Sequence, residues 1–236
     1  MAISELQLPP GVSTQQFPSP PLLAEALAER ITGLLREAIE ARGTATLVVS
    51  GGKSPIALFQ QLVRQSLDWS KVVITLADER WVPVEHVDSN EALVRRYLLV
   101  GAVAKAKFIG LYRSAVSQED AALAADEALA ELPAIDVLVL GMGDDGHTAS
   151  LFPQNPNLAE ALDPKGTRRC WPMLAPTVPH QRLSMSRALL ATARFPLLSI
   201  SGQGKLDTLR TAVAGDEASM PVRAFVQSPL EIYWCP

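Results

Sequence analysis

The sequence has little of what marks exported, membrane-spanning or disulfide-rich proteins. Its only cysteines, Cys170 and Cys235, are widely separated and have no histidine at zinc-site spacing, so we expect two ordinary thiols in a reducing compartment. No apolar run approaches the roughly 20 residues that span a bilayer. Residues 1–5 contain neither a basic region nor an apolar segment of signal-peptide length. These absences favour a cytoplasmic protein that does not associate with a membrane.

The sequence also lacks a strong charge of either sign. Lys and Arg total 21 against 25 Asp and Glu, a formal charge of -4, and the basic residues are scattered. This distribution argues against nucleic acid as the partner, although a local basic pocket for a small anion remains possible. A chain of 236 residues can form one large domain or two small ones, and no linker divides it. We therefore expect a single α/β domain over residues 1–236.

Alternating strand and helix patterns predict the α/β class. Five prolines among residues 8–21 predict an extended surface leader over about residues 1–21, and apolar residues at intervals of three and four then predict a helix over 22–41. Buried strands are predicted at residues 44–49, 72–76, 135–140, 195–200 and 230–234, and further helices after residue 55 and over 91–99, 121–132 and 206–214. Strands that alternate with helices form a mainly parallel sheet, whose carboxyl edge is where ligands bind.

The most unusual composition lies in residues 139–153, VLGMGDDGHTASLFP. Three glycines surround Asp144, Asp145 and His147 directly after a predicted strand. Glycine permits positive φ and close approach of a ligand to the backbone, so this composition indicates a binding or catalytic loop. A glycine-rich turn with a solvated Asp pair and a capping histidine is the alternative.

Two other strand ends carry comparable segments. Residues 50–55, SGGKSP, form a glycine turn before a helix, and the free N–H groups of Gly51, Gly52, Lys53 and Ser54 predict a phosphate site. The glycine spacing fits neither the Walker loop nor the dinucleotide fingerprint, and a tight turn without a ligand is the alternative. Residues 77–83, ADERWVP, place Asp78 and Arg80 at the same edge, although such a charge run can simply be solvated.

In this order, the three segments resemble those of the 6-phosphogluconolactonases, which belong with the glucosamine-6-phosphate deaminases in one superfamily of sugar-phosphate enzymes. The resemblance covers about residues 44–205 and implies a Rossmann-like three-layer fold, with a mainly parallel central sheet flanked by helices. The segment within residues 139–153 is specific to this family, and the segments at 50–55 and 77–83 are moderately specific. One family habit is missing, because Gln154-Asn155 follows Pro153 where a glycine is usual. We expect this departure to affect only a loop.

The resemblance implies hydrolysis of 6-phospho-D-glucono-1,5-lactone to 6-phospho-D-gluconate in the pentose phosphate pathway, with no metal or organic cofactor. It also implies that Arg182 and Lys205 complete the phosphate site. Lactone hydrolysis needs a base for water and stabilisation of a developing oxyanion. We assign the base to His147, with its tautomer fixed by Asp145. Arg80 would stabilise the oxyanion or orient the ring.

Several alternatives stay open. Asp78 could orient Arg80 or bind sugar hydroxyls, and a covalent route through Ser150 is disfavoured because no nucleophile elbow is present. His86 and His180 match no motif position, so we expect them in loops or on the surface. Deaminase-like isomerisation and a non-catalytic sugar-phosphate sensor are the competing functions. The sequence does not choose between a monomer and a homodimer.

Overall fold

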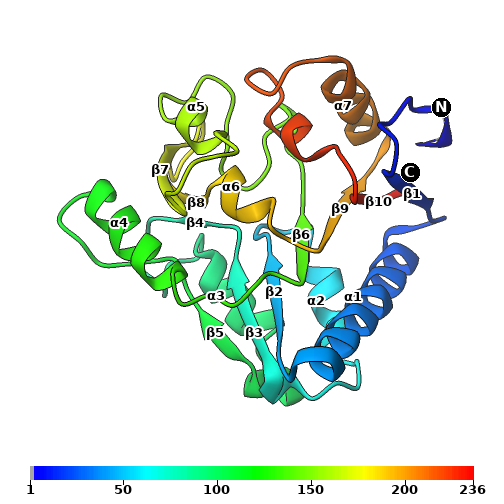
Figure 1. Ribbon diagram of the computed structural model, residues 1–236, viewed down its shortest axis with the longest axis horizontal. Helices are drawn as coiled ribbons and strands as arrows, with labels where there is room; N and C mark the ends of the chain where they lie inside the picture. The colour runs from blue at the N-terminus through cyan, green and yellow to red at the C-terminus, as the bar shows by residue number, and fades with distance from the viewer. Residues whose placement is uncertain (1–2) are drawn as a thin grey trace.

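A large parallel sheet forms the centre of the computed structural model, which describes residues 3–236 (Figure 1). Its seven strands lie in the order β1 (Ser13–Gln16), β10 (Glu231–Cys235), β9 (Phe195–Ser201), β6 (Val137–Leu140), β2 (Ala45–Val49), β3 (Val72–Leu76) and β5 (Lys107–Ile109). Every neighbouring pair is parallel. The predicted α/β class with a mainly parallel sheet flanked by helices is thus confirmed.

Seven α-helices and four short 3-10 helices accompany the sheets in the described part of the chain. The α-helices are α1 (Pro20–Arg42), α2 (Ile56–Leu62), α3 (Asn90–Tyr97), α4 (Gln118–Leu129), α5 (Leu158–Ala161), α6 (Arg187–Leu190) and α7 (Gln203–Ala214). The 3-10 helices are η1 (Ile3–Glu5), η2 (Trp69–Lys71), η3 (Gly101–Lys105) and η4 (Pro221–Phe225). Helix α1 buries an apolar stripe and ends where Gly43 adopts a left-handed conformation. None of these helices is long and apolar enough to cross a membrane.

The order of the strands determines where a ligand can bind. Every residue of β2 and β3 is buried, as expected for apolar strands covered on both faces. After β3 and β5 the chain returns to β6, which pairs with the opposite edge of β2. The order of the sheet therefore reverses between β2 and β6. In open parallel sheets, a crevice forms at the carboxyl ends of the strands at such a point.

A second sheet, which the sequence patterns did not predict, lies beside the first (Figure 1). It consists of β4 (Asp78–Arg80), β8 (Gln181–Met185) and β7 (Cys170–Leu174), and both pairings are antiparallel. Strand β4 follows β3 after Ala77 alone, so the chain passes directly from one sheet into the other. The charged DER segment, predicted to follow a strand, is itself a strand.

The leader is built into the large sheet. Strand β1 pairs in parallel with β10, and Ile3 is buried with 2% of its surface exposed. The sequence of β1, STQQ, has no alternation of apolar and polar residues, which explains why no strand was predicted there. Residues 1 and 2 of the predicted leader lie outside the described residues. The N and C labels lie near each other in Figure 1, on the side of the molecule where β1 pairs with β10.

Candidate active site

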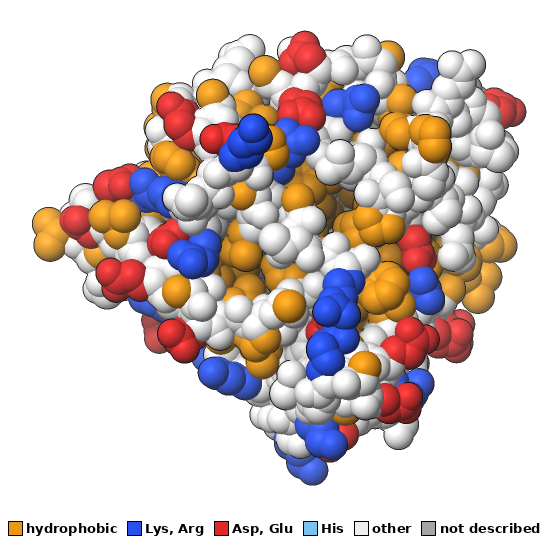
Figure 2. Space-filling model, viewed as in Figure 1, with side chains coloured by type: hydrophobic (Ala, Val, Ile, Leu, Met, Phe, Trp, Pro, Cys, Tyr) orange, Lys and Arg blue, Asp and Glu red, His pale blue; other side chains and the backbone are white. Residues whose placement is uncertain are grey.

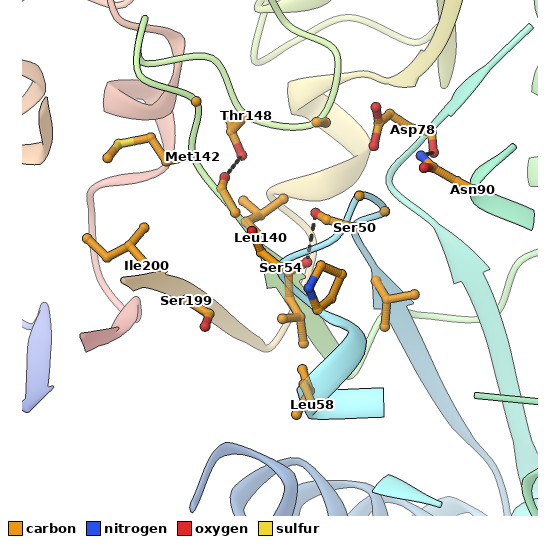
Figure 3. Close-up of a pocket in the computed structure, with 18 of the residues that line it drawn as sticks. Ser50, Ser54, Leu58, Asp78, Asn90, Leu140, Met142, Thr148, Ser199 and Ile200 are labelled. Carbon is orange, nitrogen blue, oxygen red and sulfur yellow. Dashed lines mark hydrogen bonds between the residues drawn. The ribbon is translucent and has the colours of Figure 1, made fainter. Parts of the chain in front are cut away.

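A cavity of about 420 Å³ opens where the order of the strands reverses. The two central strand ends are joined there, because the backbone N–H and the hydroxyl of Ser50 both donate to the Val139 carbonyl, at 3.1 and 3.0 Å. In Figure 3, Asp78 and Asn90 lie on one side of the cavity, with Met142 and Ile200 on the opposite side. One face of the molecule is hollowed near its centre, with acidic and basic side chains interspersed around the hollow (Figure 2).

His147 and Asp145 form a hydrogen-bonded pair at this cavity. The Nδ1 atom of His147 lies 2.5 Å from Oδ1 of Asp145, and the same oxygen accepts the backbone N–H of His147 at 3.1 Å. Burial raises the pKa of Asp145, but the hydrogen bond and charge of His147 outweigh it, so the pKa is lowered overall. The ring of Phe152 packs against the imidazole at 4.4 Å between centroids. The predicted contact between His147 and Asp145 is therefore present.

The glycines of this loop create the space that the pair occupies. A Cβ atom on Gly143 would lie 2.1 Å from Nδ1 of His147 and 2.6 Å from Oδ1 of Asp145. Gly146 has φ of +76°, which favours glycine, and its carbonyl accepts the N–H of Val222. The hydroxyl of Thr148 donates to the Gly141 carbonyl at 2.8 Å. The first of these bonds attaches the loop to η4 and the second attaches it to the end of β6, while Asp145 holds the imidazole.

Two arginines stand directly opposite each other at the cavity. Arg80 on β4 and Arg182 on β8 are partners in the antiparallel register, and both side chains line the cavity. Within residues 3–236 neither of them forms a salt bridge with a carboxylate. Burial, together with the charge of Arg80, lowers the pKa of Arg182. Like charges opposite each other destabilise a sheet, so this arrangement suits an anionic ligand.

Asp78 is buried beside these arginines and has a different partner. Its Oδ2 accepts the hydroxyl of Ser150 at 2.6 Å, and Ser150 is fully buried. Arg80 is held instead through Nη1, which donates to the carbonyl of Asp88 at 2.9 Å and to Oδ1 of Asn90 at 2.6 Å. Asp78 therefore fixes the serine at the start of the 150–153 segment, while its carboxylate still lines the cavity.

The predicted phosphate residues reach the cavity to different extents. Gly51, Gly52 and Ser54 line it, but Lys53 does not, and its side chain is exposed. Helix α2 starts after Pro55, and no side chain forms a capping hydrogen bond there. Lys205, in the first turn of α7, lines the cavity and forms a salt bridge of 2.7 Å with the exposed Asp144.

The sequence patterns missed two polar residues of the site. Asn90 is buried and lines the cavity, although it lies outside the three segments that the sequence analysis singled out. Glu79 has no exposed surface, although its place in a charge run favoured solvation. His86 and His180 lie in loops away from the cavity lining, as predicted.

No metal site accompanies these groups in the described residues. They contain no group of three or more His, Cys, Asp or Glu side chains that could hold a metal ion. Both cysteines are buried and free, and burial raises the pKa of Cys170 to about 12. Among the described residues, the titratable groups that line the cavity are one histidine, one carboxylate, two arginines and one lysine, and Asp145 is hydrogen-bonded to the histidine.

Comparisons with known proteins agree with this geometry. The family described as glucosamine-6-phosphate isomerases/6-phosphogluconolactonase matches residues 18–234. The chain is 58% identical to a 6-phosphogluconolactonase of Pseudomonas putida over 237 residues, covering 100% of this chain and 98% of the relative. It is 59% identical to one of Pseudomonas aeruginosa, with both chains fully covered.

Solved structures show the same likeness. A crystal structure of a 6-phosphogluconolactonase from Shewanella baltica superposes with a TM-score of 0.93, at 40% identity, over 97% of this chain and 100% of that one. A monomeric glucosamine-6-phosphate deaminase shares the fold at a TM-score of 0.79 and 17% identity, covering 94% of this chain and 97% of that one. The cavity, its loop and these matches lead to one conclusion: the chain belongs to the glucosamine-6-phosphate isomerase/6-phosphogluconolactonase family.

Proposed function

We propose that this protein hydrolyses 6-phospho-D-glucono-1,5-lactone to 6-phospho-D-gluconate in the pentose phosphate pathway. The relatives that match its whole length at 58 and 59% identity are named 6-phosphogluconolactonases. The observation that carries the proposal is the meeting of the His147–Asp145 pair with three cations, Arg80, Arg182 and Lys205, in one cavity. Such a cavity would offer a base and an anion-binding region to one small phosphorylated ester, which supports the proposal. We place the activity in the cytoplasm, and either a monomer or a homodimer could perform it.

His147 acts as the general base of this mechanism. Because Nδ1 faces Asp145, the other ring nitrogen, Nε2, is free to accept a proton from water. The water oxygen bonds to the lactone carbonyl carbon as its proton passes to Nε2, and negative charge develops on the carbonyl oxygen. The ring C–O bond then breaks, and the imidazolium returns the proton to the leaving oxygen. Asp145 holds the imidazole in the required tautomer and stabilises its charged form.

Arg80 supplies the stabilisation of the oxyanion. Its guanidinium is permanently charged and is fixed by two hydrogen bonds from Nη1, so little reorganisation is needed as charge develops on the substrate. Asp78, buried in the cavity wall, is placed to accept sugar hydroxyls with the oxygen that does not bind Ser150.

The phosphate group binds among Arg182, Lys205 and the backbone of the 51–54 turn. Arg182 presents a planar donor set without a carboxylate partner in the described chain, and Lys205 adds a point charge. The glycine turn supplies backbone N–H groups, although the side chain of Lys53 contributes nothing to the cavity lining. A dianion at this place would offset the repulsion between the two arginines.

Glucosamine-6-phosphate deamination is the main alternative, and Phe152 argues against it. In the deaminases, the loop after the shared Gly-His continues to a Glu just before a Pro, and that acid works with the histidine during ring opening. Here the residue before Pro153 is Phe152, whose ring packs on His147 and can neither accept nor donate a proton. The deaminase segment also has a tyrosine where this chain has Arg80. The presence of both His147 and Arg80 argues against a non-catalytic sensor.

The direct test compares two substrates with the purified protein. Acid release from 6-phosphogluconolactone is followed above its spontaneous hydrolysis, and ammonia release is followed from glucosamine 6-phosphate. We expect acid release alone. Ammonia release at a comparable rate, or acid release no faster than the spontaneous reaction, would overturn the proposal.

A further inference from the structure

Asn90 contacts three separate parts of the cavity wall. Its Nδ2 group donates to the backbone carbonyl of Asp78 at 2.9 Å, and its Oδ1 accepts Nη1 of Arg80 at 2.6 Å. A Cβ atom on Gly51 would lie 1.9 Å from the same Oδ1 atom, so the amide lies against the glycine turn. Asn90 is 1% exposed and lines the cavity close to Asp78, as Figure 3 shows. One buried amide thus connects β4, the arginine and the end of β2.

The neighbours of this amide determine its orientation. A backbone carbonyl can only accept a hydrogen bond and a guanidinium can only donate one, so the nitrogen must face Asp78 and the oxygen must face Arg80. An aspartate could hold the arginine but could not donate to Asp78. A serine or an alanine could not span both partners. The two hydrogen bonds therefore require an asparagine amide at this position.

Glu79 holds the backbone of Asn90 in place. Its carboxylate accepts the N–H groups of Asn90 at 2.6 Å and Glu91 at 2.7 Å, and it accepts the hydroxyl of Ser89 at 3.3 Å. These groups form the N-terminus of α3, where a buried carboxylate satisfies donors that have no partner within the helix. The same carboxylate also accepts the N–H of Arg80 at 2.7 Å. Residues 79 and 80 of β4 and the start of α3 are thereby tied together.

Within the described chain, these contacts hold the Arg80 guanidinium by only one of its nitrogen atoms. Two acceptors hold Nη1, the carbonyl of Asp88 and the amide of Asn90, whereas Nε has no partner in the described protein although it is buried. A buried donor without a partner is costly, and such groups are retained where a ligand completes the bonding. Holding the guanidinium by one corner leaves its other N–H groups for the ligand.

We propose that Asn90 is a positioning residue that fixes the Arg80 guanidinium in the cavity, so that its remaining N–H groups are available to the substrate. The inference rests on the proposed function, because it assigns to Asn90 an effect on the oxyanion that only a reacting lactone develops. Asn90 acts through Arg80 and takes no part in proton transfer.

A double-mutant cycle tests the inference. Asn90→Ala is expected to lower kcat by about tenfold to a hundredfold, with KM changed by less than about threefold, because the lost contact matters most in the transition state. In an Arg80→Met background, the same change is expected to lower kcat by less than about twofold. Asn90→Asp is the second variant: it keeps the shape of the side chain and can still accept from Arg80 but cannot donate to Asp78, so its kcat is expected to fall less than that of Asn90→Ala. Thermal unfolding of each variant identifies any that does not fold.

Asn157→Ala is the matched control. Its Nδ2 group also donates to a buried backbone carbonyl, that of Pro172 at 2.8 Å, but it lies away from the cavity lining. This variant is expected to lose stability and to keep its kcat. Equal losses from Asn90→Ala in the presence and absence of Arg80 would show a general structural role and would overturn the inference, as would full activity of Asn90→Ala.

A second measurement separates this inference from the proposed function. 6-Phosphogluconate carries on its carboxylate the negative charge that the neutral lactone develops only as it reacts, so its binding to Arg80 should depend on Asn90 more than the KM of the lactone does. Its binding, measured by calorimetry, should weaken about threefold to tenfold in Asn90→Ala when Arg80 is present, and should not change when Arg80 is absent. If the wild-type protein fails to hydrolyse the lactone, the proposed function falls and this binding cycle alone decides the inference. Additive losses in binding, or the absence of any binding, would overturn it.

Discussion

Replacing Arg182 with methionine should greatly weaken ligand binding while changing the free energy of unfolding only slightly. The substitution keeps the apolar stem of a residue with only 7% of its surface exposed, and it removes a guanidinium that stands opposite Arg80 and has no carboxylate partner within residues 3–236. A hydrogen bond to a charged group contributes about 1.5–3 kcal/mol, and a desolvated cation lies at the upper end of that range. We therefore expect Arg182→Met to weaken binding of 6-phosphogluconate by roughly a hundredfold.

Lys205→Met provides the comparison. Lys205 is already paired with Asp144 at 2.7 Å, so part of its charge is compensated before a ligand arrives. Its loss should weaken binding by only about tenfold, the lower end of the same range. Asp144→Asn should strengthen binding by up to about threefold, because it releases the lysine from an exposed pair. Calorimetric titration with 6-phosphogluconate, and with gluconate as the unphosphorylated reference, measures all three.

The stability of the free protein should change much less than its affinity. Arg182→Met removes the Nε bond to the Pro179 carbonyl at 2.8 Å, but it also removes the burial of a charge and its repulsion from Arg80. The free energy of unfolding should therefore fall by no more than about 1 kcal/mol. A larger fall would show that Arg182 stabilises the fold itself and would refute this reasoning, and an equal loss of affinity for gluconate would place Arg182 outside the phosphate site.

Three further outcomes follow from other parts of the site. His147→Asn should lower turnover by about 10² to 10⁴ with substrate affinity mostly unchanged, and near-normal turnover above spontaneous hydrolysis would exclude His147 as the base. Burial raises the pKa of Glu79 from 4.5 to about 7 in the folded protein. Between these pH values the unfolded chain loses the proton while the folded chain keeps it, so the contribution of Glu79 to stability falls as pH rises. The unfolding free energy of the wild type minus that of Glu79→Gln should fall by about 3 kcal/mol from pH 4.5 to pH 7 in denaturant titrations, and a pH-independent difference would contradict this. Gln154 has φ of +61°, so Gln154→Gly should change stability by between zero and about +1 kcal/mol and leave kcat unaltered, and a marked loss of activity would show that the loop is more than a connection.

The sequence predicted the central strands well because their information is local. Strands β2, β3, β6 and β9 are continuous apolar runs between turns, and each was found within about two residues. Strands β4 and β7 were missed. The first is three charged or polar residues long and the second contains Pro172, so neither shows a strand pattern without its partner β8. The structure of β4 depends on residues about a hundred positions away, and that of β7 depends on the adjacent β8.

In the site, too, contacts within one segment could be predicted from the sequence, and contacts between distant segments could not. The pairing of Asp145 with His147 could be predicted because two residues in one glycine loop cannot lie far apart. The opposition of Arg80 and Arg182 depends on the register of β4 with β8, and the role of Asn90 depends on where α3 begins relative to β4. Composition does not specify either. For Lys53, the motif correctly predicted a turn at the cavity, but it could not show that the Lys53 side chain is exposed and absent from the cavity lining.

The pairing of β1 with β10 constrains the order in which the chain can fold. Gln15 and Tyr233, which are hydrogen-bonded across these strands, are 218 residues apart in sequence. During synthesis β1 emerges long before its partner, and closing so long a loop is slow. Until β10 is made, β1 is an unpaired strand in a nascent chain, and its sequence of Ser, Thr, Gln and Gln carries no apolar side chain that would favour aggregation. Strand β1 can therefore be placed only after β10, and protection of its amides from hydrogen exchange would report that this edge of the sheet is complete.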